Sequence, residues 1–151
     1  MSVVVGVSPT SGSPAALRWA AREAQLRGVR LRAVQAWRSP RMPGSPGVRP
    51  PLSVVTGEDQ VADAELALRE HVVDALGSAD GVECVVVHGG AANALLTASA
   101  GAELLVLGEV GSGALGGVRT GFIAPQVVLK ANCPVVVMPS SVGAELEEEE
   151  L

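Results

Sequence analysis

Aromatic side chains are scarce in this sequence: its 151 residues include one phenylalanine, two tryptophans and no tyrosine. Proteins hold single-stranded nucleic acid largely by stacking bases on aromatic rings, so this composition argues against such a role. The hydrophobic fraction is nevertheless 48%, mostly alanine, valine and leucine. We therefore expect one domain in which small aliphatic side chains pack helices closely against a sheet.

Cysteines and membrane signals are equally sparse. Cys84 and Cys133 sit in or beside apolar runs without metal-ligating neighbours at a useful spacing, so we interpret them as buried free thiols in a reducing compartment. The first residues lack the basic segment and long apolar core of a signal peptide. The uncharged window 84–102 contains polar residues and adjacent glycines, which favours a strand, turn and helix over a membrane span. We expect a cytoplasmic protein that makes no membrane contact.

The net charge of −5 is concentrated near the end of the sequence. Five of the 16 acidic residues lie in residues 145–151, so residues 1–144 carry 11 acidic and 11 basic groups. We expect residues 1–142 to form the domain and residues 143–151 to be an acidic, disordered tail. Eight of the 11 basic residues precede Pro51, and they either attract phosphates or pair with acidic residues of the second helix.

Apolar runs and helical patterns alternate along the chain. Strands are predicted at Val3–Val7, Val29–Trp37, Val82–His88, Leu104–Leu107 and Val135–Met138. Helices are predicted after an N-cap at Ser13 as far as Gly28, at Glu58–Leu76, at Ala91–Ala100, and from about Phe122 to Asn132. This order predicts an α/β fold: a doubly wound, five-stranded parallel sheet with right-handed crossovers. His71 adjoins the apolar stripe of the second helix, which indicates a partly buried helix residue rather than a base.

Residues 38–56 form a long connection for a compact domain. The segment contains five prolines, two glycines and three arginines. It leaves the carboxyl end of the second predicted strand, at the edge where the first and fourth strands deliver their loops. Such a loop is typical of a lid over a binding site or of a disordered segment, and both interpretations stay open.

Glycines crowd the turn after the fourth predicted strand. They are Gly108, Gly111, Gly113, Gly116, Gly117 and Gly121. A strand, a glycine-rich loop and a helix in this order can turn backbone N–H groups toward an anion at the helix N-terminus. The same glycines can instead serve only to permit positive φ angles and close helix–sheet packing.

The glycine spacing also carries a family resemblance. Gly108-x2-Gly111-x9-Gly121, followed by a helix and a Cys-Pro-Val strand within Ala131–Val137, resembles the nucleotide-binding signature of the universal stress protein family. The resemblance covers nearly the whole chain. It implies an adenine nucleotide alpha hydrolase-like, Rossmann-like sheet with the strand order 3-2-1-4-5.

Four positions depart from the family pattern. Ser8 stands where an aspartate usually ends the first strand, and Phe122 replaces the serine or threonine after the last glycine. Glu109 follows the first glycine, and Val110 stands where a basic residue is common. A serine hydroxyl can hydrogen-bond to a nucleoside, but less strongly than a carboxylate.

The resemblance implies a site for ATP, with or without magnesium, in the crevice where the strand order reverses. The residues expected to hold the nucleotide are Val7, Ser8, Pro9, Ala36, Gly108, Gly111, Ser112, Gly113, Gly121, Phe122 and Ile123. The alternative is a nucleotide-independent, dimeric stress-response or interaction protein with a degenerate ATP site.

No catalytic set accompanies this site in the sequence. The glycine loop lacks a Walker lysine, His88 is isolated, and no metal-binding cluster is visible. A dehydrogenase is disfavoured because GxGxxG is absent after the first strand. We expect no enzymatic activity beyond slow ATP hydrolysis.

The last predicted strand is also the edge of the implied sheet. Residues 134–138 are apolar, carry no charge that would discourage pairing, and are framed by two prolines. Such edges are normally covered. We therefore expect a homodimer in which two copies of this strand pair across a two-fold axis, as family members do.

Overall fold

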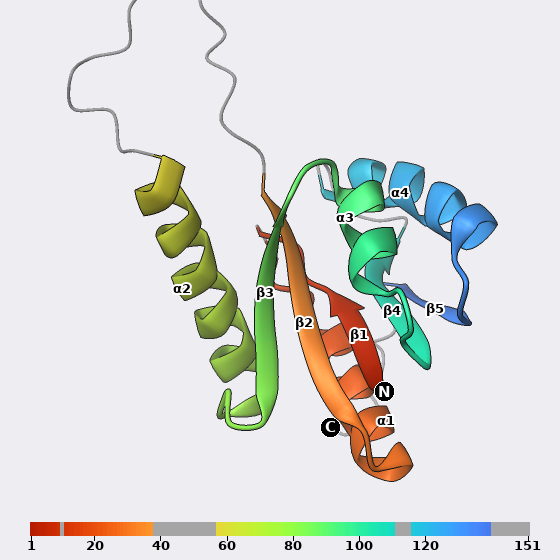
Figure 1. The fold of residues 1–151 in the computed structure, drawn as a ribbon, viewed down its shortest axis with the longest axis horizontal. Helices are drawn as coiled ribbons and strands as arrows, with labels where there is room; N and C mark the ends of the chain where they lie inside the picture. The colour runs from red at the N-terminus through yellow and green to blue at the C-terminus, as the bar shows by residue number, and fades with distance from the viewer. Residues whose placement is uncertain (10, 38–56, 111–115, 140–151) are drawn as a thin grey trace, which may run out of the picture.

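A computed structural model describes residues 1–9, 11–37, 57–110 and 116–139, in which strands and helices alternate (Figure 1). The strands are β1 (Ser2–Gly6), β2 (Arg30–Trp37), β3 (Val82–His88), β4 (Leu104–Val110) and β5 (Val135–Pro139). The helices are α1 (Pro14–Arg27), α2 (Gly57–Leu76), α3 (Ala91–Ala98) and α4 (Gly116–Lys130). The long connection 38–56 and the acidic tail 143–151 lie outside the described residues.

The described strands form one parallel sheet in the order β3-β2-β1-β4-β5, which confirms the predicted doubly wound fold. Strand β1 lies at the centre: Val3 pairs with Leu31 of β2 on one side and with Leu104 of β4 on the other. The valines of β1 suit this place, because a central strand is buried on both faces. The strand order reverses between β1 and β4, so the switch point lies there.

Each face of the sheet has its own apolar core. One core joins α1 and α2 to the sheet and includes the fully buried Leu17 and Leu68. The other joins α3 and α4 to the opposite face and includes Leu105 and Val127. Figure 1 shows α2 on one side of the sheet and α3 with α4 on the other. Among the described residues, no helix combines the length and apolar character that a membrane-spanning segment requires.

Helix α4 begins at Gly116, so the predicted start near Phe122 was wrong. Glycine costs a helix about 1 kcal/mol relative to alanine, but it is not excluded from one. The apolar face that predicted the helix, with Val127 fully buried, anchors α4 on the sheet, and residues 116–121 continue the same helix. Pro125 therefore lies inside α4, where it has no N–H to donate to the carbonyl group four residues earlier.

Strand β4 continues to Val110, beyond its predicted end at Leu107. Gly108 pairs with Met138 of β5, and the register shifts between Gly108 and Val110, as at a β-bulge. The apolar run ends at Leu107, but strand pairing depends on the backbone and continues past it. Bulges re-aim the chain and are frequent beside binding sites, and this one lies at the switch point.

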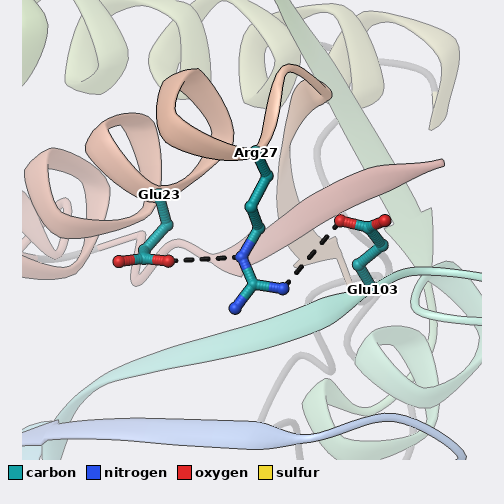
Figure 2. Close-up of polar contacts among 3 residues, drawn as sticks. All are labelled: Glu23, Arg27 and Glu103. Atoms are coloured by element: carbon teal, nitrogen blue, oxygen red, sulfur yellow. Dashed lines mark hydrogen bonds and ion pairs between the residues drawn. The ribbon is translucent and has the colours of Figure 1, made fainter.

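Polar contacts hold α1 to the opposite, amino-terminal edge of the sheet (Figure 2). Arg27, in the last turn of α1, places Nε 3.2 Å from Oε2 of Glu23 and Nη1 3.9 Å from Oε2 of Glu103. The backbone N–H of Glu103 donates to the carbonyl of Ser2 at 2.8 Å. Exposed pairs of this kind each contribute at most about 1 kcal/mol. They nevertheless tie α1 to the start of β4, and these two elements flank the switch point.

Candidate functional site

The carboxyl ends of β1, β2 and β4 meet at the switch point, where the sequence predicted a binding crevice. Beyond β1 the chain stays beside β2, because the N–H of Val7 donates to the carbonyl of Val34 at 2.8 Å. Continuing the observed registers places Ser8 beside Ala36 and Val7 beside Gly108. The fold therefore gathers four of the predicted site residues from distant parts of the chain.

The residues that follow β1 form a hydrogen-bonded turn, which we call the β1–α1 turn (residues 7–9 and 11–13). The N–H of Gly12 donates to the carbonyl of Ser8 at 2.9 Å. The N–H of Ser8 donates in turn to Oγ of Ser13 at 3.0 Å. The turn therefore closes on itself.

Ser13 occupies the N-cap position of α1, as predicted, but its side chain does not cap the helix. Its backbone is left-handed, with φ 46° and ψ 53°, and its hydroxyl makes no hydrogen bond to the first turn of α1. That conformation turns Oγ back to the N–H of Ser8. The hydroxyl thus stabilises the β1–α1 turn at the expense of the helix end. A left-handed backbone costs a residue with a side chain about 1–2 kcal/mol.

Gly108 brings the other side of the crevice against this turn. A Cβ atom added at Gly108 would lie 3.0 Å from Cβ of Ala16 and 3.2 Å from Cβ of Ser13. Both distances are shorter than ordinary van der Waals contacts, so only glycine lets β4 approach the start of α1 this closely. Gly108 therefore determines how closely the end of β4 approaches the start of α1.

Helix α2 contributes His71, whose role the sequence did not reveal. The half-buried ring lies against the β1–α1 turn, with Nε2 3.3 Å from the carbonyl oxygen of Pro9. A Cβ atom added at Gly12 would lie 2.4 Å from Nδ1 of the ring. The apolar periodicity of α2 placed His71 correctly beside the buried stripe, but it could not show which loop the ring touches.

Strand β2 adds a buried amide and an aromatic pair at the same edge of the sheet. Gln35 is 5% exposed, and its Oε1 has no hydrogen-bond partner among the described residues. The rings of Trp37 and His88 lie 4.9 Å apart between centroids. The N–H of Gly89 donates to the carbonyl of Trp37 at 2.8 Å. His88 therefore packs beside the end of β2.

The remaining predicted site residues are placed differently. Pro9 is exposed in the β1–α1 turn, whereas Gly111, Ser112 and Gly113 lie outside the described residues. Gly121, Phe122 and Ile123 lie beyond the first turn of α4. Backbone N–H groups beyond the first four of a helix bond within the helix, so those of 121–123 do not face an open loop. As binding residues, these seven positions stay predictions.

The described residues contain no set of side chains typical of metal or nucleophilic chemistry. No three His, Cys, Asp or Glu residues of the described ranges come together as metal ligands. Cys84 and Cys133 are free and half-buried. Burial raises the pKa of both thiols, and a hydrogen bond with Ser99 opposes that rise in the pKa of Cys133. Both thiols therefore stay protonated near neutral pH.

Comparisons with known proteins agree on one family. A model of the universal stress protein family matches residues 1–139. A universal stress protein of Mycobacterium tuberculosis is 32% identical over 144 residues, which cover 93% of this chain and 49% of the relative. Another, from Mycolicibacterium smegmatis, is 34% identical over 140 residues, which cover 90% of this chain and 47% of the relative. The chain thus spans about half the length of these relatives.

Solved structures show the same fold. A universal stress protein in complex with cAMP has a TM-score of 0.61 and 20% identity, over 93% of this chain and 97% of the other. A universal stress protein of Archaeoglobus fulgidus in complex with dAMP has a TM-score of 0.54 and 25% identity, over 91% of this chain and 96% of the other. With a family model matching residues 1–139 and relatives aligned along nearly all of its length, this chain belongs to the universal stress protein family.

Proposed function

We propose that this chain is an adenine-nucleotide binding module of the stress response, with ATP among its ligands. The observation that carries the proposal is the switch point between β1 and β4, where the strand registers continue to Val7 beside Gly108 and to Ser8 beside Ala36. Ligands of doubly wound sheets bind at such points. The dAMP complex of the Archaeoglobus fulgidus relative, 25% identical to this chain, supports an adenine nucleotide as the ligand.

The crevice suits the parts of a nucleotide in different ways. Ala36 is half-buried and can offer apolar surface to a base, whereas Val7 is only 5% exposed and supports this place from the core. The Ser8 hydroxyl can hydrogen-bond to the sugar or base. The first N–H groups of α4, which begins at Gly116, lack partners within the helix and favour a negative charge. We expect phosphates to lie toward this end of α4.

Nucleotide binding, rather than turnover, is the expected activity. Among the described residues, no metal-ligating cluster lies at the crevice, and the hydroxyl of Ser13 already accepts the Ser8 N–H. A base would have to sit within hydrogen-bond reach of the attacking water to accelerate hydrolysis. We therefore expect ATP to be hydrolysed slowly at most.

Calorimetric titration tests the proposal directly. We expect saturable binding of ATP, with and without magnesium, and of dAMP and cAMP, with GTP as the matched control for the base. A ligand present at about a hundred times its Kd should also stabilise the fold by about 2.7 kcal/mol, seen as a rise in Tm. If no adenine nucleotide gives either signal, the proposal fails and the nucleotide-independent alternative takes its place.

We also propose that the protein forms a homodimer through β5. This strand is at the edge of the described sheet, so one side of its backbone faces no neighbouring strand there. Two large apolar side chains near the end of α4, Val128 and Leu129, are 54% and 85% exposed. An unpaired edge with an apolar neighbourhood is typical of a surface that a second copy covers.

The molar mass in solution, measured by light scattering, tests the dimer. The unaltered protein should have the mass of a dimer at micromolar concentration. Leu129→Glu should weaken the dimer about tenfold or more, because it buries a charge in the interface. Leu26→Glu is the matched control, since Leu26 is 75% exposed on α1 and should leave the dimer intact. A monomeric mass for the unaltered protein would contradict the proposal.

A further inference from the structure

The contact between α2 and the β1–α1 turn joins two elements that are far apart in the sequence. The turn carries Ser8 and Pro9, which are expected to meet the nucleotide, whereas α2 supplies none of the expected site residues. His71 is the member of α2 that reaches the turn. Its ring meets the carbonyl oxygen of Pro9 and the backbone of Gly12.

The polar half of this contact indicates the tautomer of a neutral ring. Nε2 of His71 lies 3.3 Å from the carbonyl oxygen of Pro9. Because a carbonyl oxygen can only accept a hydrogen bond, Nε2 must carry the hydrogen and donate it. A neutral ring in this position therefore has Nδ1 unprotonated. The contact orients the Pro9 carbonyl from the side of α2.

The packing half of the contact requires glycine at position 12. Gly12 is buried and has φ +78°, a left-handed value that favours glycine. A Cβ atom there would lie 2.4 Å from Nδ1 of His71, so the ring takes the space that a side chain would fill. Ring and turn thus fit against each other.

The contact extends across the turn to the other side of the crevice. Gly12 donates its N–H to the carbonyl of Ser8, and Ser8 donates its own N–H to Oγ of Ser13. The side chain of Ser13 in turn lies against Gly108, since a Cβ there would be 3.2 Å from that of Ser13. The turn is therefore held between His71 and β4.

We propose that His71 is a positioning residue for the nucleotide site: it holds the β1–α1 turn in the conformation that receives the base. This inference rests on the proposed function, because it assigns His71 a part in that same binding. His71 acts through Pro9 and Gly12 and makes no contact of its own with the nucleotide.

Affinities of three variants test this role. His71→Leu keeps an apolar side chain without a donor, and it should weaken dAMP and ATP binding about fivefold to tenfold. His71→Gln restores an N–H donor and should recover most of that loss. Leu76→Ala, in the half-buried last position of α2, should lower Tm while leaving both affinities unchanged. Unchanged affinity in His71→Leu, or no recovery in His71→Gln, would overturn the inference.

A second experiment tests the His71 contact in the free protein, without nucleotide. The chain has only two histidines, so a long-range ¹H–¹⁵N spectrum of the free protein can be assigned with His88→Gln. At a pH where both rings are neutral, His71 should carry its hydrogen on Nε2, and the other tautomer would overturn the contact. If the unaltered protein binds no nucleotide, the proposed function and the positioning role both fail. If it binds nucleotide but His71→Leu binds equally well, only the positioning role fails.

Discussion

Replacing Leu105 with alanine is expected to lower the free energy of unfolding by about 2–5 kcal/mol. Leu105 is fully buried in β4, between Val4 of β1 and Val135 of β5 in the sheet, and packs in the core beneath α3 and α4. Alanine would remove apolar contacts and leave a cavity that neighbouring strands cannot close, because their backbones are hydrogen-bonded. Urea unfolding followed by circular dichroism measures the change.

An exposed leucine supplies the matched control for that experiment. Leu129 is 85% exposed, so Leu129→Ala should change the stability of the monomer by no more than about 0.5 kcal/mol. The two variants should be compared at a protein concentration low enough to dissociate a dimer. Equal losses in both variants would contradict the assignment of Leu105 to the core.

Gly108→Val is expected to weaken adenine-nucleotide binding about tenfold or more. Valine suits a strand, but its Cβ would lie 3.0 Å from Cβ of Ala16, and its two methyl groups would need further space. Relieving this crowding must move the start of α1 or the end of β4, and either movement changes the crevice. Overpacking of this kind lowers the free energy of unfolding by about 1–3 kcal/mol. The titration should therefore be performed well below the Tm of the variant.

The control for this variant is a glycine in open space. Nothing lies within 4 Å of a Cβ added at Gly81, and its φ of +77° is one that asparagine tolerates. Gly81→Asn should therefore bind adenine nucleotides like the unaltered protein. If Gly108→Val binds adenine nucleotides with unaltered affinity, the close approach of β4 to α1 at Gly108 does not matter for binding.

The sheet was predictable from the sequence because its signals are local or follow from the family. Each buried strand is an apolar run, each helix has an apolar stripe, and the resemblance supplied the strand order that the structure confirms. Gly28 was also a predicted helix end, and it has the positive φ angle typical of that position. These features depend on neighbouring residues, which a single sequence displays.

The start of α4 and the length of β4 were not predictable in the same way. Residues 116–121 contain three glycines, which have weak preferences, so the pattern alone could not show that they join the helix. Strand β4 likewise continues past its apolar run because β5 pairs with its backbone. Both boundaries are decided by packing against other elements.

The site was predictable in outline but not in its supporting contacts. The strand order implied by the family resemblance put Ser8 and Gly108 at one switch point, and the observed registers agree. The hydroxyl of Ser13 and the ring of His71 could not be assigned, because each partner is fixed only when the turn folds against α1 and α2. The spacing of residues along the sequence does not predict such contacts.

The central place of β1 also constrains the order in which the chain can fold. Residues 2–6 can pair with β2 early, since β2 is the next strand along the chain, and β3 can join β2 later. The second neighbour of β1 is β4, which begins only at Leu104. The edge of β1 that pairs with β4 therefore stays open until these two distant segments meet. Pairing over such a distance is slow, and an open valine-rich edge can pair with other chains. One edge of β1 therefore stays open to other chains until β4 is available to pair with it.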